Sequence, residues 1–429
     1  MAGRIQLTAR GVQDQWLTGD PQFSYFVTVF KRHTKFSTEA VEIPLTGDAS
    51  LGKTVHCRIP NNIGDLLRSV FLKVKLGNLS AHDITGTPPR YHFYNQPIAK
   101  NIIKYVDLII GGQTIERLTG DYITMYDQLY NNKDDVKQTM YFMNGHGNHL
   151  TVSESYNTFY VNLPFYFFRY PSLAIPICAI TRQLVEIKIT FKNPDDDITF
   201  KYTIGDDGEV LRQKTNEGSI INASLISDFY FISNDEKNFL KTRPMEYVIT
   251  QLQKSTITFK PTEIIKSALL NFKNPVKELF IIAKEDTDPI YEDHDLLIDT
   301  DSNDQSFSDI VKGSGSRYKK SDHRRLKNVK FVCNGSTVFD KTGMELAFHN
   351  SFNFHTGCPD PAYEFYTYSF SLYPEKHQPT GQLNMSRIIH KHINVELDDI
   401  SPNRNINVDI YALNYNVLSV KSGLAGLKF

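Results

Sequence analysis

Hydrophobic and polar residues alternate along several stretches of the chain. Residues 185–191, 366–372 and 393–397 each alternate apolar and polar positions with a period of two residues. In a β-strand this period sends one set of side chains into a core and the other toward water or a partner. Similar runs recur between clusters of Gly, Pro, Asn and Asp, which favour turns. The pattern predicts an all-β sandwich architecture.

Helical patterns are few. The clearest covers residues 121–130, where Gly120 and Asp121 are typical of a helix start. A second covers residues 234–241 and is stopped by Pro244. The sequence therefore predicts strands throughout, with short helices between some of them.

The chain also repeats itself at an offset of 223 residues, the separation of Gly112 and Gly335. Residues 106–115 align with residues 329–338 at this offset. Each copy holds a glycine pair or an Asn-Gly pair between two apolar runs. These pairs supply the positive φ that both central residues of a type I′ hairpin turn need. We therefore expect equivalent hairpins in the two halves.

Further correspondences extend the repeat. At the same offset Gly120 falls on Gly343 without a gap. Residues 65–72 resemble residues 275–282, and the Leu-Pro pair that ends at Pro164 resembles the Tyr-Pro pair that ends at Pro374. A period this long exceeds that of solenoid repeats, which is roughly 20–50 residues. It indicates a duplicated domain with its boundary between residues 234 and 244.

Composition excludes several classes of protein. The 429 residues carry 47 Lys and Arg against 48 Asp and Glu, a net charge of −1. This balance argues against a polybasic nucleic-acid binder. Apolar residues make up 40% of the chain, enough for a sizeable core, and no run approaches the roughly 18 apolar residues of a membrane span.

The chain start and the cysteines predict an intracellular setting. Residues 1–8 lack the apolar core of a signal peptide. The four cysteines are far apart and form no Cys-x-x-Cys motif: Cys57, Cys178, Cys333 and Cys358. We expect four free thiols in a reducing compartment.

Four stretches are similar to those of a known family. They are residues 11–21 followed by 30–36; residues 107–112 with Glu116; residues 368–381 with Asn384, Ser386 and Arg387; and residues 411–418 followed by 422–427. In this order they resemble the double jelly-roll major capsid protein of the nucleocytoplasmic large DNA viruses, including the chlorella viruses. The third and fourth stretches are the most specific.

The resemblance implies a fold and a domain division. The expected fold class is all-β, with two consecutive eight-stranded antiparallel jelly rolls and few short helices. The expected domains are an N-terminal arm at residues 1–30, a first jelly roll at 31–240 and a second at 241–429. The second roll would include a long exposed loop at residues 284–327.

The resemblance also implies a function. The chain would be a major capsid protein, without enzymatic activity or cofactor, in the shell of a large icosahedral double-stranded DNA virus. Three subunits would form a homotrimer that serves as a pseudo-hexagonal capsomer. Expected partners are neighbouring capsomers and minor capsid and penton proteins, with proximity to an inner viral membrane and no specific nucleic acid. Localisation would be the virion shell, after assembly in the host cytoplasm.

The segment 284–327 departs from the repeat because it is long and polar. Residues 285–309 hold ten carboxylates and no Lys or Arg, and residues 312–330 hold eight basic groups and one acid, Asp322. A loop of this length in a compact domain is functional or disordered. In the family the corresponding connection rises on the outer face of the capsomer. The basic run 317–330 is interpreted as a charge-paired surface rather than a nucleic-acid site or localisation signal.

Candidate metal sites each have a simpler interpretation. Asp299, Asp301 and Asn303 have the alternating spacing of a calcium loop, but the sixth and twelfth positions hold Asp304 and Ile310 instead of Gly and Glu. A solvated acidic loop is favoured there. His146 and His149 lie in a glycine-rich stretch and are too few for a structural zinc site.

Candidate catalytic groups are equally weak. Cys358 with His349 or His355 would suggest a thiol nucleophile, but no third orienting group is evident. The acidic runs 195–197 and 206–207 are interpreted as turns at the ends of a strand over 200–204. No P-loop, nucleophile-elbow or zincin motif occurs. We therefore assign no catalytic, cofactor-binding or metal-binding residue.

Alternative functions stay open at this point. A minor capsid paralogue would share the same segments. A jelly-roll lectin or attachment protein could use loop 284–327 as its receptor site, and a cupin-like enzyme could use the same scaffold. A cupin would need clustered His and carboxylate ligands, which the sequence does not show. The aromatic residues of the arm, Trp16, Phe23, Tyr25 and Phe26, are interpreted either as anchors to other subunits or as contacts with the first roll.

Overall fold

The computed structural model describes residues 2–9, 11–27, 30–79, 90–94, 98–131, 157–196, 198–204, 210–285, 325–357, 364–398 and 405–429. The chain divides into two compact units, Met1–Phe36 and Ser37–Phe429, which are described separately. The smaller unit contains three short helices, α1 (Ala2–Thr8), η1 (Val12–Asp14) and α2 (Gln15–Thr18).

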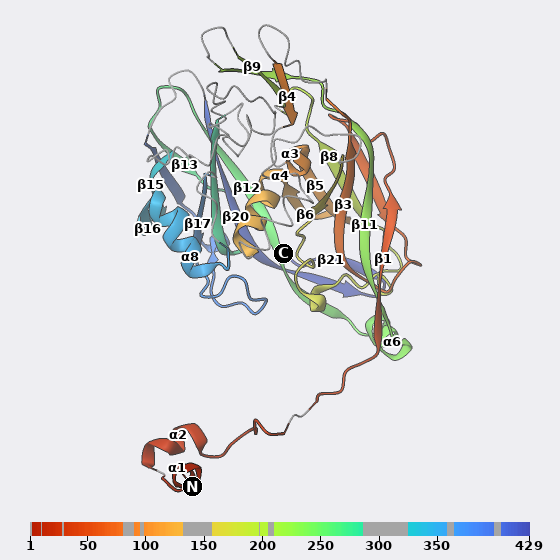
Figure 1. Ribbon diagram of the computed structural model, residues 1–429, viewed down its shortest axis with the longest axis vertical. Coiled ribbons are helices and arrows are strands. Elements are labelled where there is room, and N and C mark those ends of the chain that lie inside the picture. Colours follow the sequence, from red (N-terminus) through yellow and green to blue (C-terminus); the bar gives the residue numbers. More distant parts are fainter. Residues whose placement is uncertain are drawn as a thin grey trace. The chain divides into compact units, whose positions relative to one another are not determined.

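Eight main strands form a first sandwich in the larger unit (Figure 1). One sheet has the order β1-β11-β3-β7 and the other has the order β2-β8-β5-β6. The pairings β11–β3, β3–β7, β2–β8, β5–β8 and β5–β6 are antiparallel. The strands are β1 (Phe36–Pro44), β2 (Thr54–Ile59), β3 (Leu66–Leu76), β5 (Ile103–Ile110), β6 (Gln113–Thr119), β7 (Thr158–Asn162), β8 (Val185–Phe191) and β11 (Ile220–Ile232).

Eight further strands form a second sandwich beside the first (Figure 1). Its sheets have the orders β12-β20-β14-β17 and β13-β19-β15-β16. The strands are β12 (Met245–Phe259), β13 (Ile265–Leu269), β14 (Pro275–Glu285), β15 (Leu326–Cys333), β16 (Ser336–Thr342), β17 (Phe365–Ser369), β19 (Lys391–Leu397) and β20 (Ile406–Lys421).

The two sandwiches have the same topology. When the eight main strands of each are counted in chain order, one sheet reads 1-8-3-6 and the other reads 2-7-4-5 in both. This is the order of a jelly roll, in which two Greek keys cover one core. The expectation of two consecutive eight-stranded antiparallel jelly rolls is confirmed, and they are called the first roll and the second roll below.

The predicted hairpins are also confirmed. The first joins β5 to β6 through Gly111 and Gly112, whose φ angles are 60° and 84°. The second joins β15 to β16 through Asn334 and Gly335, whose φ angles are 48° and 85°. Positive φ at both central residues gives the turn a twist that matches the strands it connects.

Irregularities of the sheets repeat at the same offset of 223 residues. The β5–β6 ladder skips Ile115 and the β15–β16 ladder skips Val338, its counterpart. Gly120 and Gly343 are equivalent as well. A Cβ on Gly120 would lie 2.5 Å from the carbonyl oxygen of Ile103, and one on Gly343 would lie 1.9 Å from that of Leu326. Both glycines are therefore required by close backbone approach.

The correspondence between residues 65–72 and 275–282 joins the right strands but is wrong by one residue. The β3–β11 ladder skips Arg68, and the β14–β20 ladder skips Lys277. These bulge residues are equivalent, so each residue of β3 matches the one 209 positions later. A slip of one residue would exchange the core face and the outer face of a strand, and similar apolar letters on both faces of β14 conceal it.

Both predicted helices are present. Helix α4 (Gly120–Tyr130) begins after Thr119, whose Oγ1 accepts a hydrogen bond from the Tyr122 backbone N–H. Helix α6 (Asn234–Thr242) is capped in the same way by Ser233. The cap of α4 is the residue before the expected pair Gly120 and Asp121, because an extended residue with a side-chain acceptor satisfies the first free N–H groups. The remaining helices are α3 (Ile98–Asn101), η2 (Pro171–Leu173), η3 (Glu345–His349), α8 (Asn350–Phe354) and η4 (Met385–Arg387).

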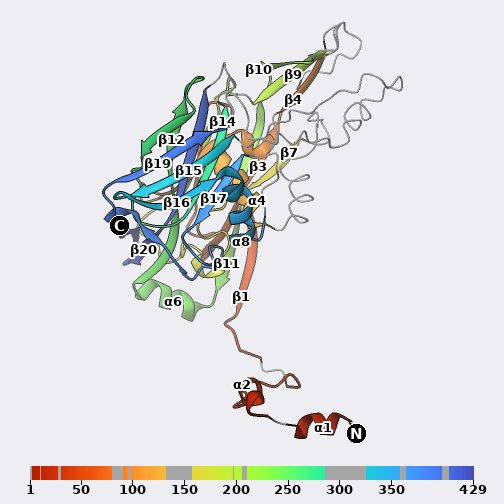
Figure 2. The ribbon, with the colours of Figure 1, turned by 90° about the vertical axis from the view of Figure 1, so that its left-hand side faces the viewer.

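A smaller sheet, β10-β9-β4, lies at the end of the first roll opposite α6 (Figure 2). Tyr94 joins it to the roll by donating a hydrogen bond to the carbonyl of Gly77 at 2.7 Å. Among the described residues, no helix is both long and apolar enough to cross a membrane. The additional strands are β4 (Arg90–Tyr94), β9 (Thr199–Ile204), β10 (Val210–Thr215), β18 (Leu383–Asn384) and β21 (Leu424–Leu427).

The domain boundaries stay predictions. The proposed division at residue 240 falls inside α6, between the last strand of the first roll and the first strand of the second. The ends of the expected loop 284–327 belong to strands: Lys284 lies in β14 and Lys327 lies in β15. Lys284 is held there by an ion pair with Asp121. Residues 286–324 lie outside the described residues.

Candidate functional site

The junction between the two rolls is formed by the outer face of the β12-β20-β14-β17 sheet. Leu279 and Ile281 of β14 belong to the core of the second roll. Phe280 and Ile282, on the opposite face of the same strand, belong to the cluster that contains the core of the first roll. Strand β20 alternates in the same way. Its core-facing residues are Val408, Ile410 and Ala412, and its junction residues are Tyr411 and Leu413. Both faces of β14 and β20 are therefore buried at these positions.

Helix α4 lies between the rolls and covers this outer face (Figure 1). The ring of Tyr122 packs against those of Phe280 and Tyr411, with centroids 6.0 and 6.1 Å apart. Thr119 Oγ1 is 3.0 Å from the hydroxyl oxygen of Tyr411. The aromatic contacts give the junction a rigid apolar centre.

Charged groups surround this centre. Lys284 lies 2.5 Å from Asp121 and 3.6 Å from Asp409, and Lys254 lies 2.8 Å from Asp409. Burial alone would raise the pKa of Asp121, but Lys284 and other nearby lysines overcome it and hold the pKa well below its usual value. Burial opposes the charge on Lys284 too, and Asp121 and Asp409 reverse the effect and raise its pKa. The network holds α4 of the first roll to β14 and β20 of the second.

A second buried polar cluster lies near the other end of α4. His355 Nε2 is 3.1 Å from Glu278 Oε1, and the Tyr130 hydroxyl donates to Glu278 Oε2 at 2.7 Å. Desolvation of Glu278 is outweighed by His355, so the pKa of the carboxyl is lowered. A backbone hydrogen bond also joins the two rolls here: the Gly357 N–H donates to the carbonyl of Leu129 at 2.8 Å.

The C-terminal hairpin contributes a further set of contacts. The Arg182 N–H donates to the carbonyl of Gly423 at 3.1 Å, and the Ala425 N–H donates to Gln183 Oε1 at 2.7 Å. Strand β21 thereby attaches the end of the second roll to the first. The two rolls are consequently joined by apolar packing, ion pairs and backbone hydrogen bonds.

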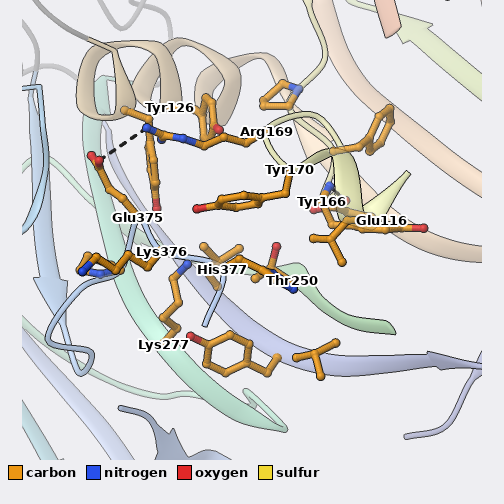
Figure 3. Close-up of a pocket in the computed structure, with 18 of the residues that line it drawn as sticks. Glu116, Tyr126, Tyr166, Arg169, Tyr170, Thr250, Lys277, Glu375, Lys376 and His377 are labelled. Atoms are coloured by element: carbon orange, nitrogen blue, oxygen red, sulfur yellow. Dashed lines mark hydrogen bonds and ion pairs between the residues drawn. The ribbon is translucent and has the colours of Figure 1, made fainter. Parts of the chain in front are cut away.

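A cavity of about 60 Å³ opens at the junction (Figure 3). Its lining includes Glu116, Arg169 and Tyr170 from the first roll and Lys277 and His377 from the second. Arg169 forms an ion pair with Glu375 across the cavity at 3.5 Å. Glu116 is fully buried. Desolvation raises its pKa to about 8, despite a hydrogen bond from the Tyr166 N–H. The carboxyl is therefore mostly neutral near pH 7.

Several sequence candidates lie outside the described residues. These are Asp299, Asp301 and Asn303 of the calcium-like spacing, with Asp304 and Ile310; His146 and His149; and Cys358. Of the proposed histidine partners of Cys358, His355 is paired with Glu278 in the junction and His349 lies near Asn353 at the surface. Within the described ranges no group of three or more metal-ligating side chains occurs.

The described charged candidates form ordinary structural contacts. At the end of the basic run, Lys327 pairs with Glu396 at 2.7 Å and Lys330 pairs with Asp340 at 3.2 Å. These partners lie on neighbouring strands and not in the acidic run. Asp196 accepts a hydrogen bond from the Asn193 N–H at 2.9 Å, as expected for a turn before β9. Residues 197 and 205–209 are not described, and Cys57, Cys178 and Cys333 are free and buried.

The junction is not among the sites that the sequence predicted. The available signal was the continuous apolar run of β14, from Leu279 to Ala283, because strands buried on both faces lack alternation. No sequence pattern indicated the ion pairs of the junction. Asp121 and Lys284 are 163 positions apart in the chain, and nothing local marks them as neighbours.

The fold and the junction define a double jelly-roll protein whose rolls are fixed to each other. Solved structures support this class. The chain has a TM-score of 0.73 and 24% identity to PBCV-1 VP54, with 95% of this chain and 100% of that chain covered. The Faustovirus major capsid protein gives a TM-score of 0.67 at 13% identity, covering 96% and 94%.

Sequence comparisons identify the family. Residues 24–232 match the family described as major capsid protein N-terminus, and residues 236–426 match large eukaryotic DNA virus major capsid protein. The chain is 30% identical to the major capsid protein of Pyramimonas orientalis virus, with 100% of this chain and 99% of the relative covered. It is 26% identical to that of Paramecium bursaria Chlorella virus 1, with both chains fully covered.

The chain therefore belongs to the major capsid proteins of large eukaryotic DNA viruses. It is a structural protein of the virion shell of a large icosahedral virus, as the resemblance in the sequence implied. The comparisons favour this function over the lectin and cupin alternatives, because the matched relatives are capsid proteins.

Proposed function

We propose that three copies of the chain form a homotrimeric, pseudo-hexagonal capsomer without intrinsic catalytic activity. The observation that carries this proposal is the shared 1-8-3-6 and 2-7-4-5 topology of the two rolls. Three subunits with two similar lobes each present six lobes. A threefold ring can then close with one heterologous contact repeated three times.

The junction supports this proposal because it makes the two lobes one rigid building block. The outer face of the β12-β20-β14-β17 sheet is buried against the first roll. A subunit whose lobes moved independently would lose entropy each time it joined a lattice. A fixed pair of lobes presents the same outline to every neighbour.

Strand β13 is the best candidate for a contact between subunits. It forms the edge of its sheet and pairs with β19 alone among the described strands. Ile265 and Leu269 share one face of β13 and are 68% and 51% exposed. An apolar edge strand left uncovered is prone to uncontrolled pairing, so a second copy of the chain is a fitting cover.

Light scattering and negative-stain electron microscopy test the assembly. The purified chain should give a mass near three times 49.2 kDa and particles with a hexagonal outline. The double variant Ile265→Asp, Leu269→Asp should shift the mass to one subunit while its circular dichroism stays unchanged. Ser267→Asp, on the same face between the two positions, is the matched control for added charge. A wild-type monomer at micromolar concentration would contradict the trimer.

The N-terminal arm is proposed to contact minor capsid proteins or neighbouring capsomers on the inner side of the shell, near an inner viral membrane. Its described aromatic side chains are highly exposed, among them Trp16 at 90% and Phe26 at 97%. Exposed aromatic residues are typical anchors of interfaces. Cross-linking mass spectrometry of intact virions should recover peptides of this arm joined to other proteins. Recovery of links only within the same chain would contradict this role.

Assembly is proposed to take place in the host cytoplasm, with penton proteins at the vertices and no specific nucleic acid bound. The free buried thiols Cys57, Cys178 and Cys333 are compatible with a reducing compartment.

A major subunit and a minor paralogue differ in copy number. Quantitative mass spectrometry of purified virions should find this chain as the most abundant protein. A low copy number would indicate the minor paralogue.

A further inference from the structure

Equivalent β-bulges in the two rolls each place a cation over a tyrosine. In the first roll, the bulge residue Arg68 lies over the ring of Tyr230 at 5.7 Å. In the second roll, the bulge residue Lys277 lies over the ring of Tyr415 at 5.9 Å. Bulges redirect a side chain out of the regular alternation of a strand. The same arrangement, a bulge residue whose cation lies over a tyrosine ring, therefore occurs once in each roll.

The two cations differ in their surroundings. Arg68 is exposed, so water solvates its guanidinium. Lys277 is only 6% exposed. Among the described residues, no ion pair or hydrogen bond to its ammonium group is found. Burial lowers its pKa, and nearby Glu278 only partly opposes the effect. An ammonium group with this environment is costly unless something charged or polar reaches it.

The ammonium of Lys277 faces the junction cavity. Figure 3 shows the side chain directed toward the middle of the lining residues, near His377. Tyr415 also lines the cavity. It is 8% exposed, and in the described part of the chain its hydroxyl has no hydrogen-bond partner. A buried cation without an ion pair and a buried hydroxyl without a hydrogen bond, as far as the described residues go, thus border the same space.

The charges of the lining favour an anion. Arg169 is neutralised by Glu375, and Glu116 is mostly neutral because burial raises its pKa to about 8. Lys277 then contributes a positive charge to the lining that Glu278 offsets only in part. A cavity of about 60 Å³ has room for several water-sized groups, since one water needs roughly 10–15 Å³ of such volume.

We propose that this cavity binds a small oxyanion, of the size of phosphate or a short carboxylate, with Lys277 as the charged ligand and Tyr415 as a hydrogen-bond donor. Because the lining comes from both rolls, the bound ion stabilises the junction. The site does not depend on the trimer, since all its lining residues belong to one chain.

Thermal unfolding of the full-length protein tests the site, with inorganic phosphate as the probe and chloride at matched ionic strength as the reference. The wild-type melting temperature should rise with phosphate and saturate, as expected for a ligand of the native state. Lys277→Met should weaken the apparent affinity roughly 10- to 100-fold, the range for a charged hydrogen bond. Tyr415→Phe should weaken it about 3- to 10-fold, the range for a neutral one.

The behaviour without phosphate distinguishes a binding role from a structural one. Lys277→Met should melt no lower than the wild type in chloride, because no ion pair or hydrogen bond to the ammonium is found among the described residues and its desolvation offsets the contact with the Tyr415 ring. Lys391 is the matched control. It is also buried, but it donates to the carbonyls of Met385 and Ile388 at 3.0 and 2.8 Å. Lys391→Met should therefore melt lower and keep the wild-type response to phosphate.

Two outcomes would overturn the proposal. An equal, non-saturating rise in the wild type and in Lys277→Met would show only the general stabilisation by phosphate as a solute. A cryo-EM map of the protein in phosphate that shows water alone in the cavity would also overturn the proposal. If Lys277→Met does not fold, Tyr415→Phe decides: an unchanged phosphate response contradicts the site. A similar saturable response to acetate would show that the site recognises the shared oxyanion chemistry.

Discussion

Strands β3 and β14 occupy the same position in the two rolls, yet their outer faces differ. On β3 the outward residues include Phe71, Lys73 and Lys75, which are half-buried or exposed. The equivalent residues of β14 are Phe280, Ile282 and Lys284, which lie in the junction. The core-facing residues are apolar in both strands. The duplication therefore preserved the inner face of the strand, while the outer face changed with what covers it.

This comparison shows where the specificity of the subunit lies. Lys73 pairs with Glu42 at the surface, at 3.1 Å, and such exposed pairs contribute little. Lys284 occupies a partly buried network with Asp121 and Asp409. Lys75, which is equivalent to Lys284, is exposed like this pair. The same residue type thus has different energetic weight at the two positions.

The largest expected effect comes from removing the ammonium group of Lys284. Lys284→Met leaves Asp121 and Asp409 with fewer cations in a buried setting. We expect a loss of about 3–5 kcal/mol in unfolding free energy, the range for removing one partner of a buried pair. Lys75→Met is the matched control and should change stability by less than about 0.5 kcal/mol. Chemical denaturation measures both. Equal losses would contradict the distinction between the two faces.

Gly343→Ala should have the next largest effect. A Cβ there would lie 1.9 Å from the carbonyl oxygen of Leu326, so the backbone must shift. We expect a loss of about 3 kcal/mol, the upper part of the usual range for overpacking. Gly120→Ala should lose somewhat less, because its closest carbonyl oxygen is at 2.5 Å. Thermal melts that match the wild type for both would show that the close approach is not real.

Gly335→Val tests the turn alone. No atom lies within 4 Å of a Cβ at this position, but φ is 85°. Strain at such a site is on the order of 1–3 kcal/mol. Gly112→Val, at the equivalent turn with φ of 84°, should lose the same amount. A clear difference between the two melting curves would show that the hairpins are not energetically equivalent.

Glu116→Gln should have the smallest effect near pH 5, and an effect that grows as the pH rises. Burial raises the pKa of Glu116 from 4.5 to about 8. The native state therefore binds more protons than the unfolded state between these values, and the wild type loses stability as the pH rises through that window. Glutamine removes this loss.

Melting temperatures across the window measure the difference. The variant and the wild type should differ little near pH 5. Above pH 8 the variant should be the more stable of the two, since a buried neutral amide replaces a buried carboxylate. A constant difference at all pH values would show that the carboxyl does not titrate there.

Local residue patterns were enough to predict the fold of each roll. Period-two alternation placed β8 and β19, and the Gly-Gly and Asn-Gly pairs placed both hairpins, because these signals act through neighbouring residues. The repeat then showed that one fold occurs twice, and the family-specific segments indicated the capsid function.

How the rolls are joined, and where their polar groups meet, follows from contacts between segments that are distant in the chain. Glu278 and His355 are separated by 77 positions in the chain, and burial between two sheets brings them together. The same burial removes water from Lys277, while its counterpart Arg68 stays solvated. Local patterns set which face of a strand is apolar. The electrostatic role of a side chain depends on solvent and distant partners, which only the packed structure specifies.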